Sequence, residues 1–286
     1  MEENKEEDLL NEDWVIKSSD IRVLSGEDNV LGRGSYGEVR IAEWRGLKVA
    51  AKQLHAFSLS SDQANDEFAE KAKENFLQEM KLLAQLRHPN LVLFLGVALN
   101  SQGSLLAVTE LLPHSLYDLL EGRGRPPGGA LTFFEVLDLA GDVAAGLAYL
   151  HGRDPAVVHR DLSAKNVLYD GRAAKLADLG QAKVFGPGGA NSRNTQTAMP
   201  GAMVYAAPEV LTGKYSARVD VFSFGVLLAQ LATGEHPRIE RRQHQVDAAA
   251  RRFPAARNLL HRCLSLHPDM RPAAAELQRA LAALKA

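Results

Sequence analysis

The sequence His159-Arg160-Asp161-Leu162, with Asn166 shortly after it, is the most informative part of this chain. A carboxylate and an amide at this spacing can do two different jobs within one loop. Asp161 could orient a hydroxyl group and accept its proton, and Asn166 could hold a metal ion against phosphate oxygens. Chance could produce one such loop, so the prediction depends on other motifs that accompany it in a fixed order.

The composition of the chain is that of an ordinary globular protein. Its 286 residues are enough for two lobes with a shared core, and 46% of them are hydrophobic and 24% charged. The formal net charge of −2 gives no electrostatic reason to expect a nucleic-acid partner. The single cysteine, Cys263, excludes an internal disulfide and predicts a reducing, cytoplasmic compartment, where we expect it to be a small buried residue.

The first thirteen residues are strongly acidic, with seven aspartate or glutamate side chains. A signal peptide needs a basic start and an apolar centre, so we expect residues 1–20 to form a solvated acidic arm instead. No apolar stretch in the chain reaches the roughly 20 residues that span a bilayer. We therefore expect no membrane insertion.

Apolar periodicity divides the rest of the chain into a strand-rich part and a helix-rich part. In residues 21–112 it predicts one helix, over residues 62–86, and several strands: residues 21–31, 38–44, 47–53, 91–97 and 105–111. After Pro113 the pattern is mainly helical. A β-rich part followed by an α-rich part favours an α+β protein with two lobes, residues 21–112 and 113–286, over a doubly wound sheet.

Local signals predict three features of the helical part. Thr132-Phe133-Phe134-Glu135 has the spacing of a capping box at a helix start. Residues 219–232 are apolar on nearly all sides, which indicates a buried central helix. Pro272 fits the first turn of a last helix, with Leu277, Leu281 and Leu284 on one face.

Gly32-Arg33-Gly34-Ser35-Tyr36-Gly37 is a glycine-rich turn that is weak evidence when taken alone. A dinucleotide-binding turn of this form needs a helix after it and an acidic residue about 20 residues further on. Here a strand pattern, residues 38–42, follows instead. We therefore favour a hairpin whose glycines let backbone amides approach phosphate oxygens closely.

Lys52 stands near the end of a short apolar stretch and could bring one positive charge into a closed site. Taken alone, a surface lysine at a strand end would be the better interpretation. Glu79, in the later part of the predicted helix, could pair with it. A solvated helix residue is the alternative for Glu79, but its apolar neighbours Phe76 and Met80 place it near the buried face.

Asp178-Leu179-Gly180 follows a strand-like stretch, and its carboxylate could bind Mg²⁺ because hard cations prefer oxygen ligands. Such a tripeptide alone is usually a turn, and only its position after the Asp161–Asn166 loop makes it informative. His159 is better interpreted as a packed structural histidine, since no second histidine or cysteine lies at metal-ligand spacing.

Two further motifs lie near the end of the chain. Ala207-Pro208-Glu209 precedes the predicted central helix, which Asp220 opens, and Arg271 precedes the last helix. Glu209 and Arg271 could form a buried ion pair. Such a pair is weak evidence for stability, but the loss of one partner is strongly destabilising.

These motifs together resemble the eukaryotic protein kinases over about residues 21–285. Six elements occur in order: the glycine loop, Lys52, Glu79, the His159–Asn166 loop, Asp178-Leu179-Gly180 and Ala207-Pro208-Glu209. The resemblance is to the tyrosine-kinase-like group, most of whose members phosphorylate serine and threonine. It implies a two-lobed fold with a β-rich N-lobe and a mainly helical C-lobe, with ATP and Mg²⁺ as cofactors and protein substrates as partners.

The resemblance also implies a nucleotide-binding set, with ATP lying between the lobes. Its members are glycine-loop, adenine-contacting, gatekeeper, hinge and phosphate-binding residues: Leu31, Gly32, Gly34, Gly37, Val39, Ala50, Lys52, Thr109, Glu110, Leu112, Leu168 and Asp178. Lys52, held by Glu79, would bind the α- and β-phosphates. Asn166 and Asp178 would hold Mg²⁺, and Asp161 would be the catalytic base.

The chain departs from the family pattern at several positions. Leu179 replaces the usual phenylalanine, and as a leucine of similar reach it should preserve packing. Ser163 and Ala202 stand where serine/threonine kinases usually carry lysine and threonine, which leaves both Ser/Thr and Tyr specificity open. Met199-Pro200-Gly201 before Tyr205 is similar to the tyrosine-kinase-like group.

The resemblance implies that Arg160 reads a phosphate on an activation loop, where Ser192, Thr195 and Thr197 are the candidate sites. Two alternatives to an active protein kinase remain open: a pseudokinase that binds nucleotide as a scaffold, and a kinase of small metabolites. The arginine-rich residues 237–262 could dock substrates, although a solvated helical face is the more common meaning of such a pattern.

Overall fold

The computed structural model describes residues 14–34, 37–58, 80–100, 104–123, 130–179, 182–185, 203–212 and 216–286. Contacts divide the chain into two units: residues 1–87 with 92–111, called here the sheet unit, and residues 88–91 with 112–286, called the helical unit. The predicted division after residue 112 differs from this at two places, because Leu112 and residues 88–91 group with the helical unit.

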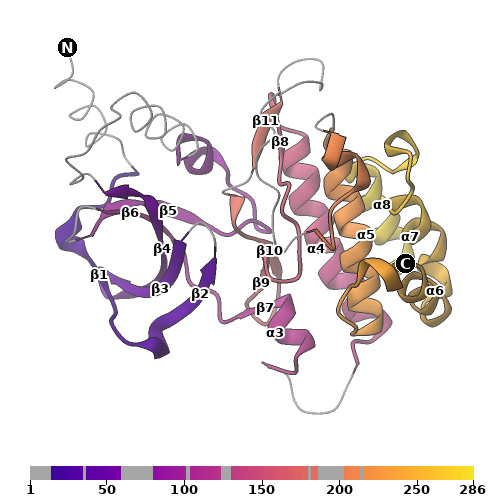
Figure 1. Cartoon of the computed structure of the whole chain (residues 1–286), viewed down its shortest axis with the longest axis horizontal. Helices are drawn as coiled ribbons and strands as arrows, with labels where there is room; N and C mark the ends of the chain where they lie inside the picture. Colours follow the sequence, from indigo (N-terminus) through magenta and orange to yellow (C-terminus); the bar gives the residue numbers. More distant parts are fainter. Residues whose placement is uncertain are drawn as a thin grey trace. The chain divides into compact units, whose positions relative to one another are not determined.

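The sheet unit is built on one antiparallel sheet (Figure 1). Its strands are β1 (Ile21–Val23), β2 (Val30–Gly34), β3 (Gly37–Trp44), β4 (Leu47–Ser58), β5 (Phe94–Leu99) and β6 (Ser104–Glu110). Five strands follow the order β1-β3-β4-β6-β5, and β2 pairs with β3. Small and branched side chains form a buried cluster in this unit: Ile16, Ala42, Val49, Ala51, Ala98, Leu106 and Val108.

The prediction of one strand over residues 21–31 is wrong, because the 3₁₀ turn η2 (Glu27–Asn29) separates β1 from β2. Gly26 has a φ of 96°, a conformation that favours glycine, and the chain turns there. The Asn29 side chain donates a hydrogen bond to the Ser25 carbonyl at 2.7 Å, which closes the turn. Strand propensity is therefore overridden by local turn chemistry.

Two other predicted elements of this unit have different bounds. The strand predicted from residue 91 begins at Phe94, because Leu91 instead forms an isolated bridge with Leu176 in the helical unit. Of the predicted helix over residues 62–86, residues 80–85 are helical and Leu86 follows the helix, while residues 62–79 lie outside the described residues.

Residues 14–20, which the sequence places in the acidic arm, are folded. Ile16 is buried within the sheet-unit cluster, and residues 18–20 form the 3₁₀ turn η1 (Ser18–Asp20). The Ile16 amide donates to the Val97 carbonyl at 2.7 Å. The ordered structure of the sheet unit therefore begins before residue 21, and the acidic residues 1–13 lie outside the described residues.

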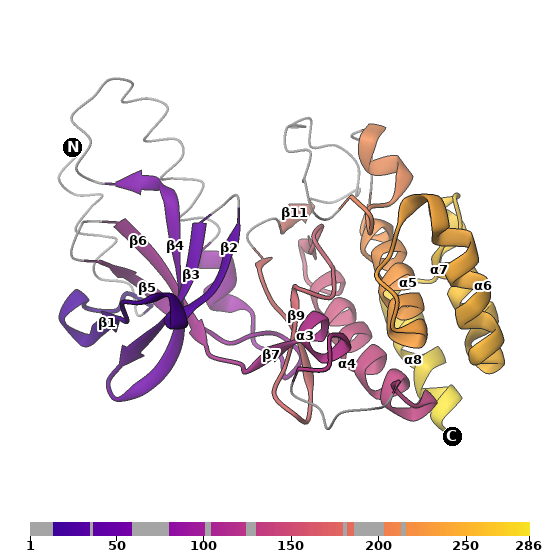
Figure 2. The same cartoon turned by 60° about the horizontal axis from the view of Figure 1, so that its bottom comes forward.

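The helical unit contains most of the described α-helices (Figure 2). They are α3 (Leu116–Leu120), α4 (Phe133–His151), α5 (Arg218–Thr233), α6 (Arg242–Arg252), α7 (Arg257–Cys263) and α8 (Ala274–Lys285). The 3₁₀ turns are η4 (Pro208–Thr212), η5 (Ile239–Arg241), η6 (Pro254–Ala256) and η7 (Pro268–Met270). Among the described residues, no helix has both the length and the apolar character needed to cross a bilayer.

The helical unit also contains short paired strands. β7 (His114–Ser115), β9 (Val167–Tyr169) and β10 (Ala174–Leu176) form one small sheet in the order β10-β9-β7. β8 (Ala156–Val158) pairs with β11 (Lys183–Phe185).

Two of the predicted helical features are confirmed. The Thr132 side chain accepts from the Glu135 amide, and the Glu135 side chain accepts from the Thr132 amide, so α4 begins with a capping box. Nearly every side chain of α5 is buried, and the helix ends at Gly234, whose φ of 75° is left-handed. Packing against α4, α6 and α7 explains why α5 is apolar on all sides.

The predicted place of Pro272 is wrong. α8 begins at Ala274 with Ala273 as its N-cap, so Pro272 lies before the helix. Arg271 has an extended backbone, as expected of a residue before proline, and this keeps the helix from starting earlier. Leu277 and Leu281 are fully buried, as the apolar pattern predicts.

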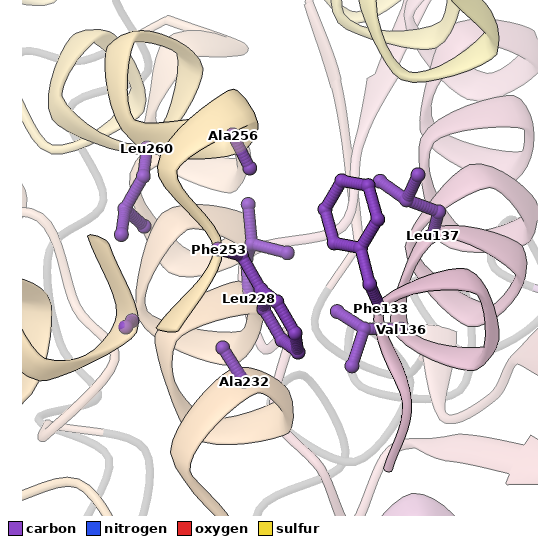
Figure 3. A pocket seen from close by; sticks show the side chains of 9 residues that line it. Phe133, Val136, Leu137, Leu228, Ala232, Phe253, Ala256 and Leu260 are labelled. Carbon is purple, nitrogen blue, oxygen red and sulfur yellow. The ribbon is translucent and has the colours of Figure 1, made fainter. Parts of the chain in front are cut away.

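A small apolar cavity of about 10 Å³ lies within the helical unit, where α4, α5 and α6 meet the turn before α7 (Figure 3). Phe133 and Phe253 face each other there with ring centroids 5.0 Å apart. An apolar space of this size has no polar partners for even one water molecule. We therefore assign it to the core rather than to a ligand.

Candidate active site

The β9–β10 hairpin places two of the predicted site residues at the same end. Val167 is paired with Leu176, Asn166 directly precedes β9, and Asp178 lies two residues beyond β10. The Ala177 amide donates to the Asn166 carbonyl at 2.8 Å, which extends the pairing past the strands. The register of the hairpin therefore brings Asn166 beside the residue that precedes Asp178.

Asp161 and Asn166 are joined by hydrogen bonds. The Asn166 Nδ2 atom donates to the Asp161 carboxylate Oδ2 at 2.8 Å and to the Asp161 backbone carbonyl at 2.7 Å. A turn between them is closed by the Asn166 amide, which donates to the Ser163 carbonyl at 3.1 Å. Because Nδ2 is turned toward Asp161, the side-chain oxygen Oδ1 of Asn166 is the atom suited to bind a cation. This side-chain oxygen and the Asp178 carboxylate are both of the ligand type that Mg²⁺ prefers.

His159 is a buried structural residue, as the sequence predicts. Its Nδ1 accepts a hydrogen bond from the Asp161 amide at 3.3 Å, so its Nε2 is the donor to the Ala177 carbonyl at 3.0 Å. One donor and one acceptor are thus assigned to the two ring nitrogens of a neutral imidazole. The ring connects the Asp161 loop to the end of the hairpin.

Asp220 holds the backbone of the same loop, a role that the sequence did not predict. Its carboxylate accepts from the His159 amide and from the Arg160 amide, each at 2.8 Å. Its Oδ2 is also 2.8 Å from Nε2 of His151, at the end of α4. The sequence did contain a signal for this role: an acidic residue in an otherwise apolar helix, which must have polar partners if its carboxylate is buried.

Burial alone would raise the pKa of Asp220, but its partners outweigh that effect. The hydrogen bond from His151 and the charges and amides around the carboxylate hold the pKa below its ordinary value. A carboxylate with a depressed pKa contributes stability above its unfolded pKa, about 3.9, and loses it as pH falls through the folded pKa. Asp220 is therefore ionised at neutral pH and anchors the loop as an anion.

We predict that Asp220→Asn destabilises the protein by about 1–3 kcal/mol or more, because an amide cannot accept from both backbone N–H groups as the anion does. Denaturant unfolding of the variant measures this loss. Asp138→Asn, at an exposed position on α4, is the matched control and should have a small effect. Equal effects of the two substitutions would contradict the anchoring role.

Two residues of this region have a backbone conformation that is rare for side chains other than glycine. Arg160 has a φ of 69° and Asp178 a φ of 53°. Such conformations cost about 1–3 kcal/mol each and persist where the surroundings impose them. Arg160 directly precedes Asp161, and Asp178 directly follows Ala177, whose amide donates to the Asn166 carbonyl, so local strain coincides with the candidate site.

The sheet unit collects the other predicted residues on one face. Val39 is paired with Lys52 in the β3–β4 ladder, and Ala50 with Thr109 in the β4–β6 ladder. Paired residues share a face, as do residues two apart in a strand, so Val39, Ala50, Lys52 and Thr109 all lie on the same side of the sheet. Val49 and Ala51, which point the other way, are buried in the core cluster.

The remaining predicted residues of this set occupy strand ends. Gly32 is paired with Val39, and Gly34 with Gly37 at the closing end of the β2–β3 hairpin, while Leu31 lies at the irregularity in that ladder. Glu110 ends β6, where its carboxylate accepts from the Leu93 amide at 2.7 Å. Leu112 is buried at the start of the helical unit, and Leu168 is paired with Lys175.

Several predicted residues lie outside the described part of the chain. They are Glu79, the glycine-loop tip at residues 35–36, Gly180, the candidate phosphorylation sites Ser192, Thr195 and Thr197, and residues 199–202. The structure therefore groups Asp161, Asn166 and Asp178 within the helical unit, and Val39, Ala50, Lys52 and Thr109 within the sheet unit.

The predicted pair of Glu209 and Arg271 is confirmed. Two guanidinium nitrogens of Arg271 donate to the two carboxylate oxygens of Glu209, at 2.5 and 2.9 Å, and the Arg271 side chain is fully buried. Cys263 is also buried as predicted, and burial raises the pKa of its thiol to about 12. A thiol with that pKa is not a nucleophile at neutral pH.

The chain belongs to the family described as protein tyrosine and serine/threonine kinases, whose pattern matches residues 26–281. Serine/threonine-protein kinase VIK from Arabidopsis thaliana is 32% identical over 289 residues, which cover 96% of this chain and 62% of VIK. Serine/threonine-protein kinase CTR1 from the same plant is 35% identical over 288 residues, covering 96% of this chain and 33% of CTR1.

These similarities establish the two-lobed α+β kinase fold, with the curled sheet as the N-lobe and the helical unit as the C-lobe. The chain spans less than two thirds of the length of both of these relatives. The comparisons therefore concern the kinase domain alone.

Proposed function

We propose that the chain transfers the γ-phosphoryl group of ATP to serine and threonine hydroxyls of protein substrates. The observation that carries this proposal is the hydrogen-bonded pair of Asp161 and Asn166 at the end of the hairpin that leads to Asp178. A proton acceptor next to two oxygen ligands for a metal ion is the arrangement that phosphoryl transfer needs.

In the proposed reaction the substrate hydroxyl oxygen forms a bond to the γ-phosphorus, and the bond from that phosphorus to the β–γ bridging oxygen breaks. Asp161 accepts the hydroxyl proton, and ADP leaves with the electron pair of the broken bond. Mg²⁺, when bound, would neutralise charge on the phosphates, and Asn166 and Asp178 would hold it.

The sheet unit would supply the other half of the nucleotide site. Lys52, paired with Glu79, would bind the α- and β-phosphates, and the backbone of the β2–β3 hairpin would cover the phosphates. Val39 and Ala50 share the face of Lys52, which supports their proposed contact with adenine. Thr109 would be the gatekeeper, next to the hinge that begins at Glu110.

Serine and threonine are the proposed acceptors because the two relatives named above are serine/threonine-protein kinases. The family description covers tyrosine kinases too, and Ser163 stands where a lysine is usual. Placement in the tyrosine-kinase-like group rests on the motifs given above. Leu179 is buried, which supports the expectation that it replaces phenylalanine without loss of packing.

The proposal predicts that the protein with Mg²⁺ and labelled ATP transfers label to a generic protein substrate, and that Lys52→Ala lowers this transfer strongly. Phosphoamino-acid analysis of the product should yield phosphoserine and phosphothreonine. Phosphotyrosine would contradict the proposed specificity. ATP binding without transfer would instead support the alternative of a nucleotide-binding scaffold.

The expected partners and location remain predictions. Protein substrates are proposed from the family, and the basic residues 237–262 are a candidate docking face for them. A cytoplasmic location is expected from the single cysteine, which is buried.

A further inference from the structure

Residues 14–16, named here the N-terminal strap, run along one edge of the sheet. Val15 forms a parallel bridge with Val97 in β5, the last strand in the sheet order among the described strands. The Ile16 amide donates to the Val97 carbonyl at 2.7 Å, and the Val97 amide donates to the Trp14 carbonyl at 2.9 Å. The strap therefore covers an edge that would otherwise present unpaired backbone groups.

Gly96 makes this close approach possible. A Cβ atom at this position would lie 2.2 Å from the Trp14 carbonyl oxygen and 3.0 Å from the Ile16 Cγ1 atom. The backbone of Gly96 also has a φ of 151°, which side chains other than glycine rarely adopt. Any larger residue at position 96 must displace the strap, because the atom in its way belongs to the backbone.

Two side chains of the strap, Trp14 and Ile16, pack into different clusters of the sheet unit. Trp14 packs against the cluster of Met80, Phe94, Val97 and Ala107, as do Leu83 and Ala84 from the helical residues 80–85. Ile16 is part of the other cluster, which contains Val49 and Ala51 of β4. The strap thus packs against both the helical residues 80–85 and the strand that contains Lys52.

Both partners of the proposed phosphate-binding pair adjoin these clusters in the sequence. Glu79 directly precedes Met80, and Lys52 directly follows Ala51. A shift of Ala51 by even a fraction of an ångström would be transmitted to Lys52, because a close-packed interior resists compression.

We propose that the strap is a positioning element for the nucleotide site, with Trp14 and Ile16 packing together the described end of the helix that contains Met80 and the strand β4 that contains Lys52. The inference rests on the proposed function. Trp14 is a positioning residue, since it acts through the packing of Met80 and β4 rather than by touching nucleotide.

Coupling of this kind is reciprocal, because a strap that changes nucleotide affinity must itself be stabilised by nucleotide to the same extent. The amide of Ile16 reports this directly through its hydrogen bond to Val97. We expect ADP with Mg²⁺ to slow hydrogen exchange of the Ile16 amide in the wild-type protein by about fivefold or more. Ligand binding slows every amide that exchanges through global unfolding, so a strap that only stabilises the fold would be slowed no more than the amides of α5.

Variants test the same coupling through affinity. Gly96→Ala should displace the strap and weaken ADP binding by about fivefold or more. Gly46→Ala is the matched control: Gly46 has a φ of 81° in the β3–β4 turn, but an added Cβ would meet nothing within 4 Å. Trp14→Ala should weaken binding as Gly96→Ala does, and Trp14→Phe should retain most of the affinity.

The outcomes separate this inference from the proposed function. If ADP binds but slows Ile16 exchange no more than that of the α5 amides, or if Gly96→Ala binds ADP as well as Gly46→Ala does, the strap has no positioning role and the kinase proposal stands. If the wild-type protein binds no ADP at all, both proposals fail together. The exchange measurement on the wild type decides the matter even if a variant does not fold.

Discussion

Asp161→Asn should lower the rate of phosphoryl transfer by about 10²–10⁴-fold, because proton acceptance by a positioned carboxylate contributes about that much. The asparagine has nearly the same shape, and its side-chain oxygen can still accept from Asn166 Nδ2, which lies 2.8 Å from the Asp161 carboxylate. The fold and nucleotide binding should therefore survive, and the loss should fall on kcat rather than on the KM for ATP.

Steady-state kinetics with labelled ATP measure this, together with thermal unfolding to show that the variant is folded. Asp154→Asn, an exposed position in the same unit, serves as the matched control and should behave as wild type. If Asp161→Asn retained full activity, the role of Asp161 as the base would be wrong. If neither the wild-type protein nor the Asp161→Asn variant transferred label although ATP bound, the scaffold alternative would be favoured instead.

The sequence could predict the fold class and the order of the chemical motifs because these depend on local patterns. The capping box at Thr132, the apolar helix α5 and the strand before Asp178 are each specified by residues a few positions apart. Even so, strand bounds were wrong where a turn interrupted an apolar run, as at Gly26.

Contacts between distant residues were largely beyond prediction. Asp220 accepts from amides sixty or more positions away, and Trp14 meets Gly96 and Val97 across a similar separation. Local periodicity contains no signal for such pairings, which arise from how the sheets and helices pack. The pair of Glu209 and Arg271 is an exception, which the sequence offered only as a possibility and the structure confirms.

Removing either partner of that pair should destabilise the protein by about 3–5 kcal/mol, because the remaining charge is left buried. Arg271 is the more deeply buried partner, because its side chain is fully buried whereas the Glu209 side chain is 14% exposed. Its guanidinium also donates to the Ser265 carbonyl at 2.8 Å, and its Cζ atom lies 4.9 Å from the centroid of the Phe222 ring. Glu209→Ala would leave these contacts in place but would remove the only carboxylate that pairs with it among the described residues.

A double-mutant cycle with Glu209→Ala and Arg271→Ala distinguishes a coupled pair from two independent residues. The double variant should be less destabilised than the sum of the single variants, with a coupling of about 0.5–3 kcal/mol in denaturant unfolding. The exposed pair of Arg262 and Glu276, at 2.6 Å, is the matched control, and its coupling should stay below about 1 kcal/mol because water screens it. Additive losses at Glu209 and Arg271 would show that their close contact contributes nothing beyond each side chain alone.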